Sequence, residues 1–451
     1  MSLRWALGHA TVSTATILFR GTESGTLVVT HAGGRETAAV DTSVNDGTAL
    51  ITLRNLSGPT AWTATLGSLS ASGTARPMPA AAPFRVAWLS CVQLNYVCPG
   101  ERIMTRNPVA VFHLGDEPYP EANTTYHQTI DGLNTDDSTE NAYTWHRAIV
   151  LGDFPGYEPL NHGAPNYRQP DDHEFAGNDD WDHSVANAVG IPAAIPAAPT
   201  QAEIDAHWAQ INAARIVYHG GNPSGTYPTA VAQKPGEADA ATPASNYPPL
   251  YFKVTIGPAT FFHLDCISHR DAVADTDDAS KSMLGTEQLA QLQAALAACT
   301  TTFKVIVSGK MTYPHPQKNG NQDSWRAYTT ERNALLAWID ANITGCLWIV
   351  GDQHYPHVAS LTQAVDGIDH VAVCACPAGV QMNDQIPTTG RDEICWTYGV
   401  SDEKGDRYWG ELLVTDDYIQ AEIYRARRGE RVWCGRVAAG SNALSYPSSR
   451  Y

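Results

Sequence analysis

The chain has 451 residues, of which 43% are hydrophobic and 17% are charged, and this composition excludes an intrinsically disordered protein. The length exceeds one ordinary core and favours two domains. Lysine and arginine number 29 against 47 aspartate and glutamate residues, which gives a formal net charge of −18. Such a charge repels polyanions, so duplex nucleic acid is not expected as a partner unless metal or a local basic patch offsets it.

No run of apolar residues approaches the roughly 20 needed to cross a bilayer, so we expect no transmembrane segment. Residues 1–5 lack the charged and then apolar pattern of a secretory signal. The chain as it stands is therefore expected in the cytoplasm, or outside it if a signal has been removed. The 9 cysteines are an odd number, so at least one of them has no partner within the chain. The oligomeric state is not indicated.

The N-terminal region predicts a small β-sandwich, because β-branched residues gather in short segments separated by glycine and Asn/Asp turns. The predicted strands are residues 11–19, 26–30, 49–53 and 62–66, with turns at 33–34 and 45–47. Residues 75–83 (ARPMPAAAP) are rich in proline and predict a linker. We therefore expect one domain over residues 1–79 and a second over residues 80–451.

The second region predicts an α/β layered fold, because short apolar runs alternate with amphipathic segments. The predicted buried strands are residues 84–89, 109–114, 303–307 and 346–350, and the helices are 286–299, with Thr286 as a candidate cap, and 330–342. A terminal hairpin is expected at 410–415 and 418–423. Residues 190–249 predict an insertion rich in proline and alanine, with one helix at 201–215 and a loop at 235–249.

Three of the predicted strands end in polar residues. The first ends at Cys91, the second at Gly115-Asp116, and the third at Gly351-Asp352-Gln353-His354. In an open α/β sheet the ligand site lies at the carboxyl ends of the strands. Glycine before each aspartate permits a sharp turn into such a site. His113 lies inside its apolar strand, and we interpret it as a hydrogen-bonded core residue.

The types of side chain at these positions suit metal ions. Tyr119 offers a phenolate three residues after Asp116, and the segment 171–174 (DDHE) is followed by Asn178. Phenolate and thiolate favour an ion such as iron, whereas carboxylate and amide oxygens suit calcium, magnesium or manganese. If Asp116 bridges two ions, the pair would clamp a phosphoryl group and lower the pKa of bound water towards about 7, giving hydroxide.

Each motif alone has a common structural explanation. A Gly-Asp pair often follows a strand, and Cys91 and Tyr119 taken singly are typical core residues. The DDHE run taken singly is typical of a solvated loop, and His315 is either a cleft residue or part of a plain loop. Their joint occurrence at successive strand ends favours a site.

In this order the motifs resemble the alkaline phosphatase D (PhoD-like) family of calcineurin-like metallophosphoesterases. The matching segments are Ser90-Cys91, residues 115–119 (GDEPY), residues 171–174 with Asn178, and residues 351–354 (GDQH). Leu264-Asp265 with Arg270 is similar to a further stretch of the family and is expected to follow a strand. The resemblance covers residues from about 84 to 426, and the N-terminal domain resembles the fibronectin-like module of such proteins.

The resemblance implies a fold and a ligand set. The fold is a four-layer αββα sandwich preceded by the small β-sandwich. One ion, iron, would be bound by Cys91, Asp116, Tyr119 and His354, and a second, calcium or another divalent ion such as Mn, Mg or Zn, by Asp116, Asp172 or Asn178, and Asp352. His173 would protonate or stabilise the leaving oxygen, a role that suits imidazole near neutral pH. Arg270 would contact substrate.

The expected function is hydrolysis of small phosphate mono- or diesters at a binuclear site by metal-bound hydroxide. Glu117 stands where the family has an aromatic residue, and at the mouth it would disfavour highly anionic substrates. Other departures are Pro118, Pro170 and Ile267, none of them at a proposed ligand. The alternatives are a phospholipase-like phosphodiesterase, with Ile191, Ile195 and Trp208 as candidate rim residues, and a non-catalytic binding protein on the same scaffold.

Overall fold

The computed structural model describes residues 3–43, 47–92, 98–117, 151, 156–169, 171–172, 251–267, 269–312, 324–361, 371–375, 394–397 and 407–445. Several predicted features lie outside these residues: Tyr119, His173, Asn178, His315 and the insertion at 190–249. Among the described residues, no helix is both long and apolar enough to cross a membrane.

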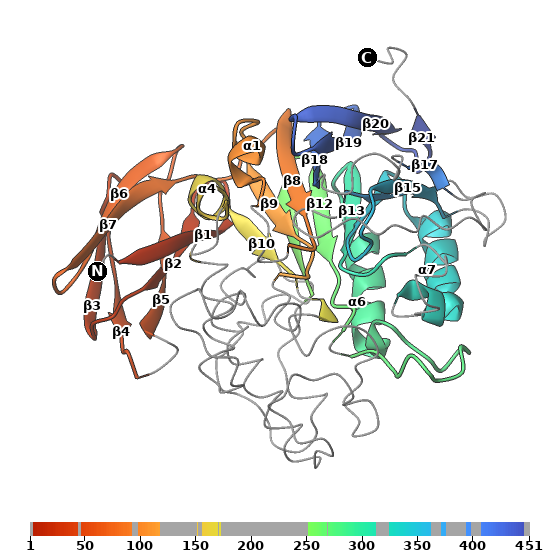
Figure 1. Cartoon of the computed structure of the whole chain (residues 1–451), viewed down its shortest axis with the longest axis horizontal. Helices are drawn as coiled ribbons and strands as arrows, with labels where there is room; N and C mark the ends of the chain where they lie inside the picture. Colours follow the sequence, from red (N-terminus) through yellow and green to blue (C-terminus); the bar gives the residue numbers. More distant parts are fainter. Residues whose placement is uncertain are drawn as a thin grey trace.

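The N-terminal region consists of two small antiparallel sheets (Figure 1). One has the order β1-β2-β5 and the other β4-β3-β6-β7. Their strands are β1 (Arg4–Ala10), β2 (Ala15–Arg20), β3 (Gly25–His31), β4 (Gly34–Val40), β5 (Thr48–Leu53), β6 (Thr60–Leu66) and β7 (Leu69–Ala75). Strand β6 alternates buried and exposed residues along most of its length, as expected for a half-buried strand. The predicted turn at 33–34 adjoins the β3–β4 hairpin.

Two mixed seven-stranded sheets form the rest of the described fold. The first sheet has the order β10-β9-β8-β18-β19-β20-β21, and the second β11-β12-β13-β14-β16-β15-β17. The first contains β8 (Phe84–Leu89), β9 (Ala110–His113), β10 (Asn166–Arg168), β18 (Tyr408–Val414), β19 (Tyr418–Arg425), β20 (Glu430–Ala438) and β21 (Leu444–Ser445). The second contains β11 (Phe252–Ile256), β12 (Ala259–His263), β13 (Phe303–Ser308), β14 (Cys346–Val350), β15 (His357–Ser360), β16 (Val371–Cys374) and β17 (Ile394–Thr397).

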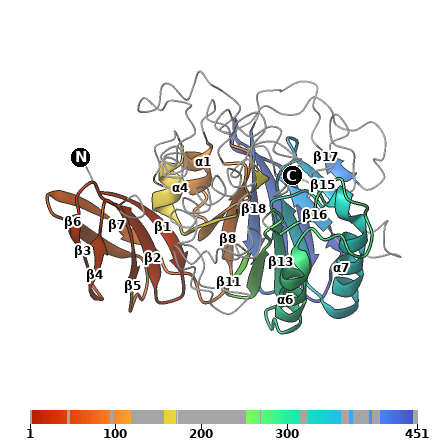
Figure 2. The same cartoon turned by 90° about the horizontal axis from the view of Figure 1, so that it is seen from below.

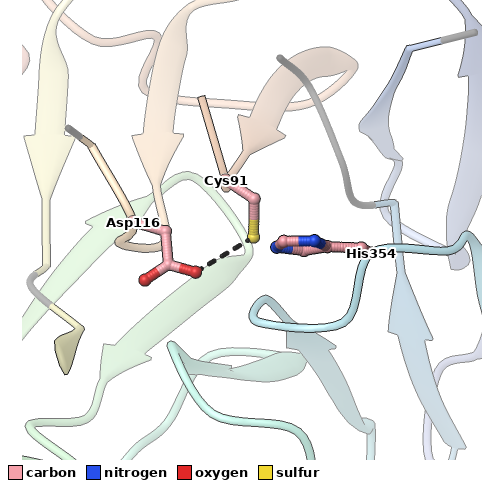
Figure 3. Close-up of side chains that lie close together, drawn as sticks. All are labelled: Cys91, Asp116 and His354. Atoms are coloured by element: carbon pink, nitrogen blue, oxygen red, sulfur yellow. Dashed lines mark hydrogen bonds between the residues drawn. The ribbon is translucent and has the colours of Figure 1, made fainter. Parts of the chain in front are cut away.

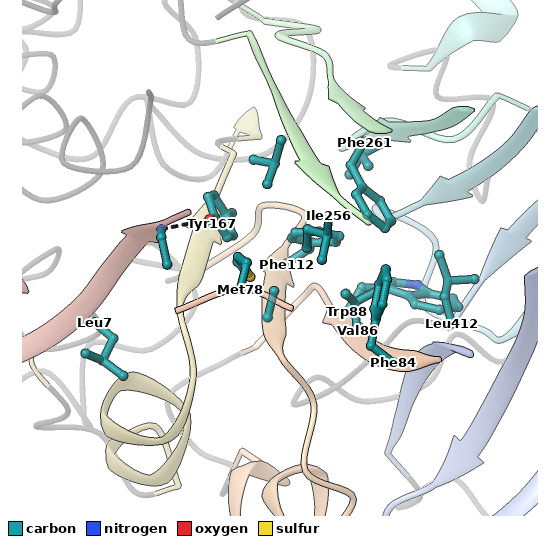
Figure 4. Packing of buried hydrophobic residues seen from close by; sticks show 14 of the residues in the cluster. Leu7, Met78, Phe84, Val86, Trp88, Phe112, Tyr167, Ile256, Phe261 and Leu412 are labelled. Carbon is teal, nitrogen blue, oxygen red and sulfur yellow. Dashed lines mark hydrogen bonds between the residues drawn. The ribbon is translucent and has the colours of Figure 1, made fainter. Parts of the chain in front are cut away.

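The core lies where these two sheets face each other (Figure 2). Trp88 and Phe112 of the first sheet and Phe261 and Val305 of the second belong to one buried apolar cluster. The Phe112 and Phe261 ring centroids are 4.8 Å apart, and Figure 4 shows both side chains within this cluster. Both sheets are therefore covered on their inner faces by the same core, which explains the apolar run of β14 and that of β8, which only Arg85 interrupts.

Helices lie on the outer faces of the sheets. Helices α6 (Gly285–Ala297) and α7 (Thr329–Asn342) contribute Leu292 and Leu335 to a cluster with Trp348 of the second sheet. Helices α1 (Gly100–Met104) and α4 (Glu158–Gly163) are short and share a cluster with β8 and β9. The 3-10 helix η6 (Trp325–Tyr328) leads into α7. The predicted α/β class is confirmed at the level of mixed sheets flanked by helices.

The predicted cap of α6 by Thr286 is wrong. The helix has Leu284 at its N-cap, with no capping hydrogen bond from that side chain. Gly285 N donates to Ser282 Oγ at 2.8 Å, and Leu284 N donates to Glu331 Oε1 at 3.2 Å. Glu331 lies in the first turn of α7, so the start of α6 is capped by side chains from outside the helix.

The predicted linker contains neither helix nor strand over residues 76–83, but part of it is buried in the protein interior. Met78 is buried and belongs to the core cluster that also contains Phe84 and Leu7 (Figure 4). Met78 N donates to Thr11 O at 2.8 Å, which ties the segment to the N-terminal sheets. The apolar core is thus continuous from the N-terminal sheets into the two larger ones.

Candidate metal centre

The predicted ligands follow strands that end at one edge of the fold. Strands β8, β9 and β10 are parallel neighbours, and Cys91, Asp116 and the pair Asp171-Asp172 follow them in that order. Strands β13 and β14 are parallel neighbours in the second sheet, and Asp352 and His354 follow β14. The carboxyl ends of parallel strands meet at the same edge, so each sheet delivers part of the site.

The two sheet edges approach closely at Gly351. Gly351 N donates to Ser308 O at 3.1 Å within the second sheet. A Cβ atom at this glycine would lie 2.8 Å from Gly309 O, 3.0 Å from Leu114 O and 3.1 Å from Ser90 Oγ, and the last two belong to segments that follow strands of the first sheet. Gly351 is therefore required by the close approach of backbones, whereas Gly115 has a φ of 91° and provides the turn that was predicted.

Cys91, Asp116 and His354 form a first group of candidate ligands, drawn in Figure 3. One ligand atom from each lies within 4.8 Å of the others. The Cys91 thiol donates to Asp116 Oδ2 at 3.3 Å, and His354 lies on the other side of the sulfur. Cys91 and Asp116 are buried and His354 is half-buried.

Asp116, Asp171, Asp172 and Asp352 form a second group, again with ligand atoms within 4.8 Å of one another. Asp116 belongs to both groups, which is the position that was predicted for a bridging residue. Asp171 was quoted as part of the DDHE motif but not as a ligand. The structure brings it together with the three predicted carboxylates.

The backbone is strained at three of these residues. Cys91, Asp116 and Asp352 have φ values of 59°, 60° and 68°, in the left-handed region that non-glycine residues rarely adopt. Among the described residues, Asn55 and Asn107 are the other non-glycine positions with positive φ. Such strain costs on the order of 1–3 kcal/mol per residue and is characteristic of functional sites, where the surrounding fold enforces it.

Lys310, which the sequence analysis missed, lies in the second group. Its Nζ atom is 2.8 Å from Asp171 Oδ1, 2.7 Å from Asp172 Oδ1 and 3.4 Å from Asp352 Oδ1. Burial raises the pKa of Asp171 well above its usual value, Lys310 opposes this, and the carboxylates of Asp172, Asp116 and Asp352 raise it further. The signal for Lys310 was present, since it follows Ser308-Gly309 at the end of a buried strand.

Glu117 belongs to a buried ion-pair network behind Asp116. It is 2% exposed, and its Oε2 atom accepts from Arg168 Nη1 at 2.9 Å and lies 2.8 Å from His113 Nδ1. Arg168 Nη2 donates to Asn161 Oδ1 at 2.7 Å, and His113 Nε2 lies 2.8 Å from Asn166 Oδ1. The interpretation of His113 as a hydrogen-bonded core residue is confirmed. The prediction that Glu117 lies at the mouth of the site is wrong. Its carboxylate is buried and its charge is paired with Arg168 inside this network.

Arg270 is described and is buried, at 7% exposure, beyond the end of β12. Strand β12 was expected shortly before it, and the structure shows this strand. A contact of Arg270 with substrate stays a prediction. Tyr119, His173 and Asn178 lie outside the described residues, so their roles stay predictions as well.

The donor atoms fit metal ions in both groups. Thiolate, imidazole and carboxylate together suit iron or zinc, and a set of carboxylates suits calcium, magnesium or manganese. The second group has four buried or half-buried carboxylates, and three of them contact the ammonium of Lys310. Buried carboxylates are stable when cations pair with them or when they take up protons, and the ligand types present here fit metal cations.

We expect Gly351→Ala to destabilise the protein by about 1–3 kcal/mol, because the added methyl group overlaps backbone oxygens of both sheets. Chemical denaturation followed by tryptophan fluorescence measures the change. Gly58→Ala is the matched control, since a Cβ atom there meets nothing within 4 Å. Equal stability of the two variants would contradict the close approach of the sheets.

Comparisons with known proteins give one family match and several similarities of fold. The sequence model of the PhoD-like phosphatase family matches residues 86–381. A structure described as that of PhoD superposes with a TM-score of 0.75 at 16% identity, covering 99% of this chain and 92% of that one. Purple acid phosphatase PPD1 from yellow lupin (Lupinus luteus) seeds gives 0.58 at 11% identity, covering 100% and 77%. At these identities the two structures show similarity of fold alone.

No curated protein matches the chain by sequence. The family match spans more than half of the chain and includes Cys91, Asp116, Asp172, Asp352 and His354. The chain belongs to the PhoD-like phosphatase family.

Proposed function

We propose that this protein is a metal-dependent phosphoesterase that hydrolyses small phosphate mono- or diesters at two adjoining cation positions. The observation that carries the proposal is the sharing of Asp116 between two groups of ligand atoms, one with thiol and imidazole and one with carboxylates only. We propose iron for the first position, with Tyr119 as a further ligand. We propose calcium or another divalent ion for the second, with Asn178 as a further ligand.

Bound cations would supply charge that stabilises a phosphoryl group and would lower the pKa of a water ligand towards about 7. The chain's own residues hold the geometry. Asp116 is buried beside Cys91 and is fixed by a backbone pair, in which Cys91 N donates to Gly115 O at 3.1 Å and Val92 N to Asp116 O at 2.9 Å. We propose His173 as the residue that protonates or stabilises the leaving oxygen, and Arg270 as a substrate contact.

We also propose the finer division of the fold. Residues 1–79 are assigned as a fibronectin-like β-sandwich and residues 80–451 as the catalytic domain, with an insertion at 190–249. The layers of the catalytic domain are assigned as a four-layer αββα sandwich. This assignment is supported by the apolar clusters on the outer face of each sheet, to which α6 and α7 contribute on one side and α1 and α4 on the other.

Elemental analysis of the purified protein, combined with hydrolysis assays, tests the function. We expect bound metal, and turnover of p-nitrophenyl phosphate or its bis-ester that a chelator abolishes and added iron and calcium restore. Preference for the bis-ester would favour the phospholipase-like phosphodiesterase. Protein that binds neither ion and stays inactive after reconstitution would contradict the proposal and favour a binding protein.

A further inference from the structure

We propose that Lys310 is a built-in cation of the second ligand group and competes with the second metal ion for its carboxylates. This inference rests on the proposed function, because it concerns how the same site is loaded. Lys310 is 0% exposed, and its ammonium contacts the three carboxylates of the second group that the first group does not share. Its ammonium therefore lies among the carboxylates that are the candidate ligands of the second metal ion.

The contacts use the oxygens that a divalent ion needs. The ammonium has three donors, and Asp171, Asp172 and Asp352 each present Oδ1 to it. Carboxylate oxygens of this kind are also the ligands that calcium takes. An ammonium and a divalent ion held by the same oxygens repel each other strongly, so one must leave for the other to bind.

The backbone around Lys310 is well anchored. Ser308 Oγ donates to Lys310 O at 2.6 Å, and the same oxygen of Ser308 accepts from Trp325 Nε1 at 3.4 Å. Trp325 N donates to Met311 O at 3.2 Å on the other side. A second metal ion must therefore displace the side chain of Lys310 alone, because its main chain is held from both directions.

The two positions are consequently unequal. The first group of Cys91, Asp116 and His354 combines a thiol, a carboxylate and an imidazole within 4.8 Å of one another and is expected to bind its ion tightly. The second group already contains a positive charge, so its affinity for a metal ion is reduced. The wild-type protein is expected to bind one metal ion tightly and a second at least about tenfold more weakly.

Calorimetric titration of the chelator-treated full chain with manganese or calcium chloride, after loading with one equivalent of iron, tests this inference. In Lys310→Met we expect the dissociation constant of the second ion to fall about tenfold or more, because the competing charge is gone. Lys310→Arg keeps the charge and is expected to bind the second ion as weakly as the wild type. Lys304→Met is the matched control and should leave both affinities unchanged, because Lys304 lies in β13, the strand that precedes Lys310, and its half-buried side chain is outside both ligand groups.

Identical second-ion affinities in the wild type and Lys310→Met would overturn the inference. If Lys310→Met does not fold, the wild type alone decides, since two dissociation constants within tenfold of each other would also overturn it. Hydrolysis of p-nitrophenyl phosphate is measured in parallel. If the protein is active and binds two ions equally tightly, only the proposed role of Lys310 is contradicted. If the protein is inactive and binds no ions, both the proposed function and this inference are contradicted.

Discussion

Asp116→Asn is expected to lower kcat/KM for p-nitrophenyl phosphate by about a thousandfold or more. Asp116 belongs to both groups of candidate ligands, so we expect the loss of its negative charge to weaken cation binding at both proposed positions. Cation stabilisation of a phosphoryl group is worth several kcal/mol, and each factor of ten in rate corresponds to about 1.4 kcal/mol. Steady-state kinetics gives the loss of activity, and elemental analysis of the same sample gives the loss of bound metal.

Two further variants separate the groups. Cys91→Ala should remove the ion of the first position, whereas Asp352→Asn should affect the second, because each belongs to one group only. Asp340→Asn on the exposed face of α7 controls for the change in net charge and should keep full activity. Undiminished metal content in Asp116→Asn would show that this residue does not bridge the two positions.

Arg168→Met is expected to lower the free energy of unfolding by about 3–5 kcal/mol, because it leaves Glu117 buried without its cationic partner. Burial of His113 and the charge of Arg168 both lower the pKa of His113. Removing the Arg168 charge therefore lets the pKa of His113 rise. The folded variant then binds protons more readily than the folded wild type. The loss of stability should therefore be larger at about pH 8 than at about pH 6.

Urea denaturation at the two pH values measures this effect. Arg54→Met is the matched control, since Arg54 pairs with Glu36 at 3.2 Å but its side chain is 60% exposed. Exposed pairs contribute about 0–1 kcal/mol, so this variant should change stability little. In Arg168→Met with Glu117→Gln the buried charge is removed as well, and part of the loss should return. A loss below about 1 kcal/mol in Arg168→Met would argue against a desolvated network.

The secondary structure was predictable where burial is uniform. Strands β8 and β14 begin and end at the predicted residues, because a strand covered on both faces appears as an apolar run, which in β8 only Arg85 interrupts. Among the strands of the N-terminal region, β1, β4 and β7 were missed. Strand β1 is buried along nearly its whole length and so lacks alternation, and β4 has few β-branched residues and two charged ones. Capping of α6 depends on Glu331, which no local pattern could assign.

The candidate site was predictable to the extent that it consists of polar residues directly after buried strands. Cys91, Asp116, Asp352 and His354 could be selected in this way, and the structure brings all of them to one edge. Lys310 also follows a buried strand but was not selected, and Arg168 lies within β10 and has no such local signal. Their burial distinguishes them from ordinary surface charges, and burial depends on what packs around them.

By itself the sequence determined the types of ligand, the turns that present them and the strands that carry them, because these features depend on neighbouring residues. Only the tertiary structure decided that the ligands come from two sheets, that Asp116 lies in both groups, and that Lys310 is among the carboxylates. Strand β8 pairs with β18 rather than with β14, and no local pattern encodes a partner so distant in the chain. Long-range pairing and the approach of the sheets at Gly351 follow from packing of the whole core.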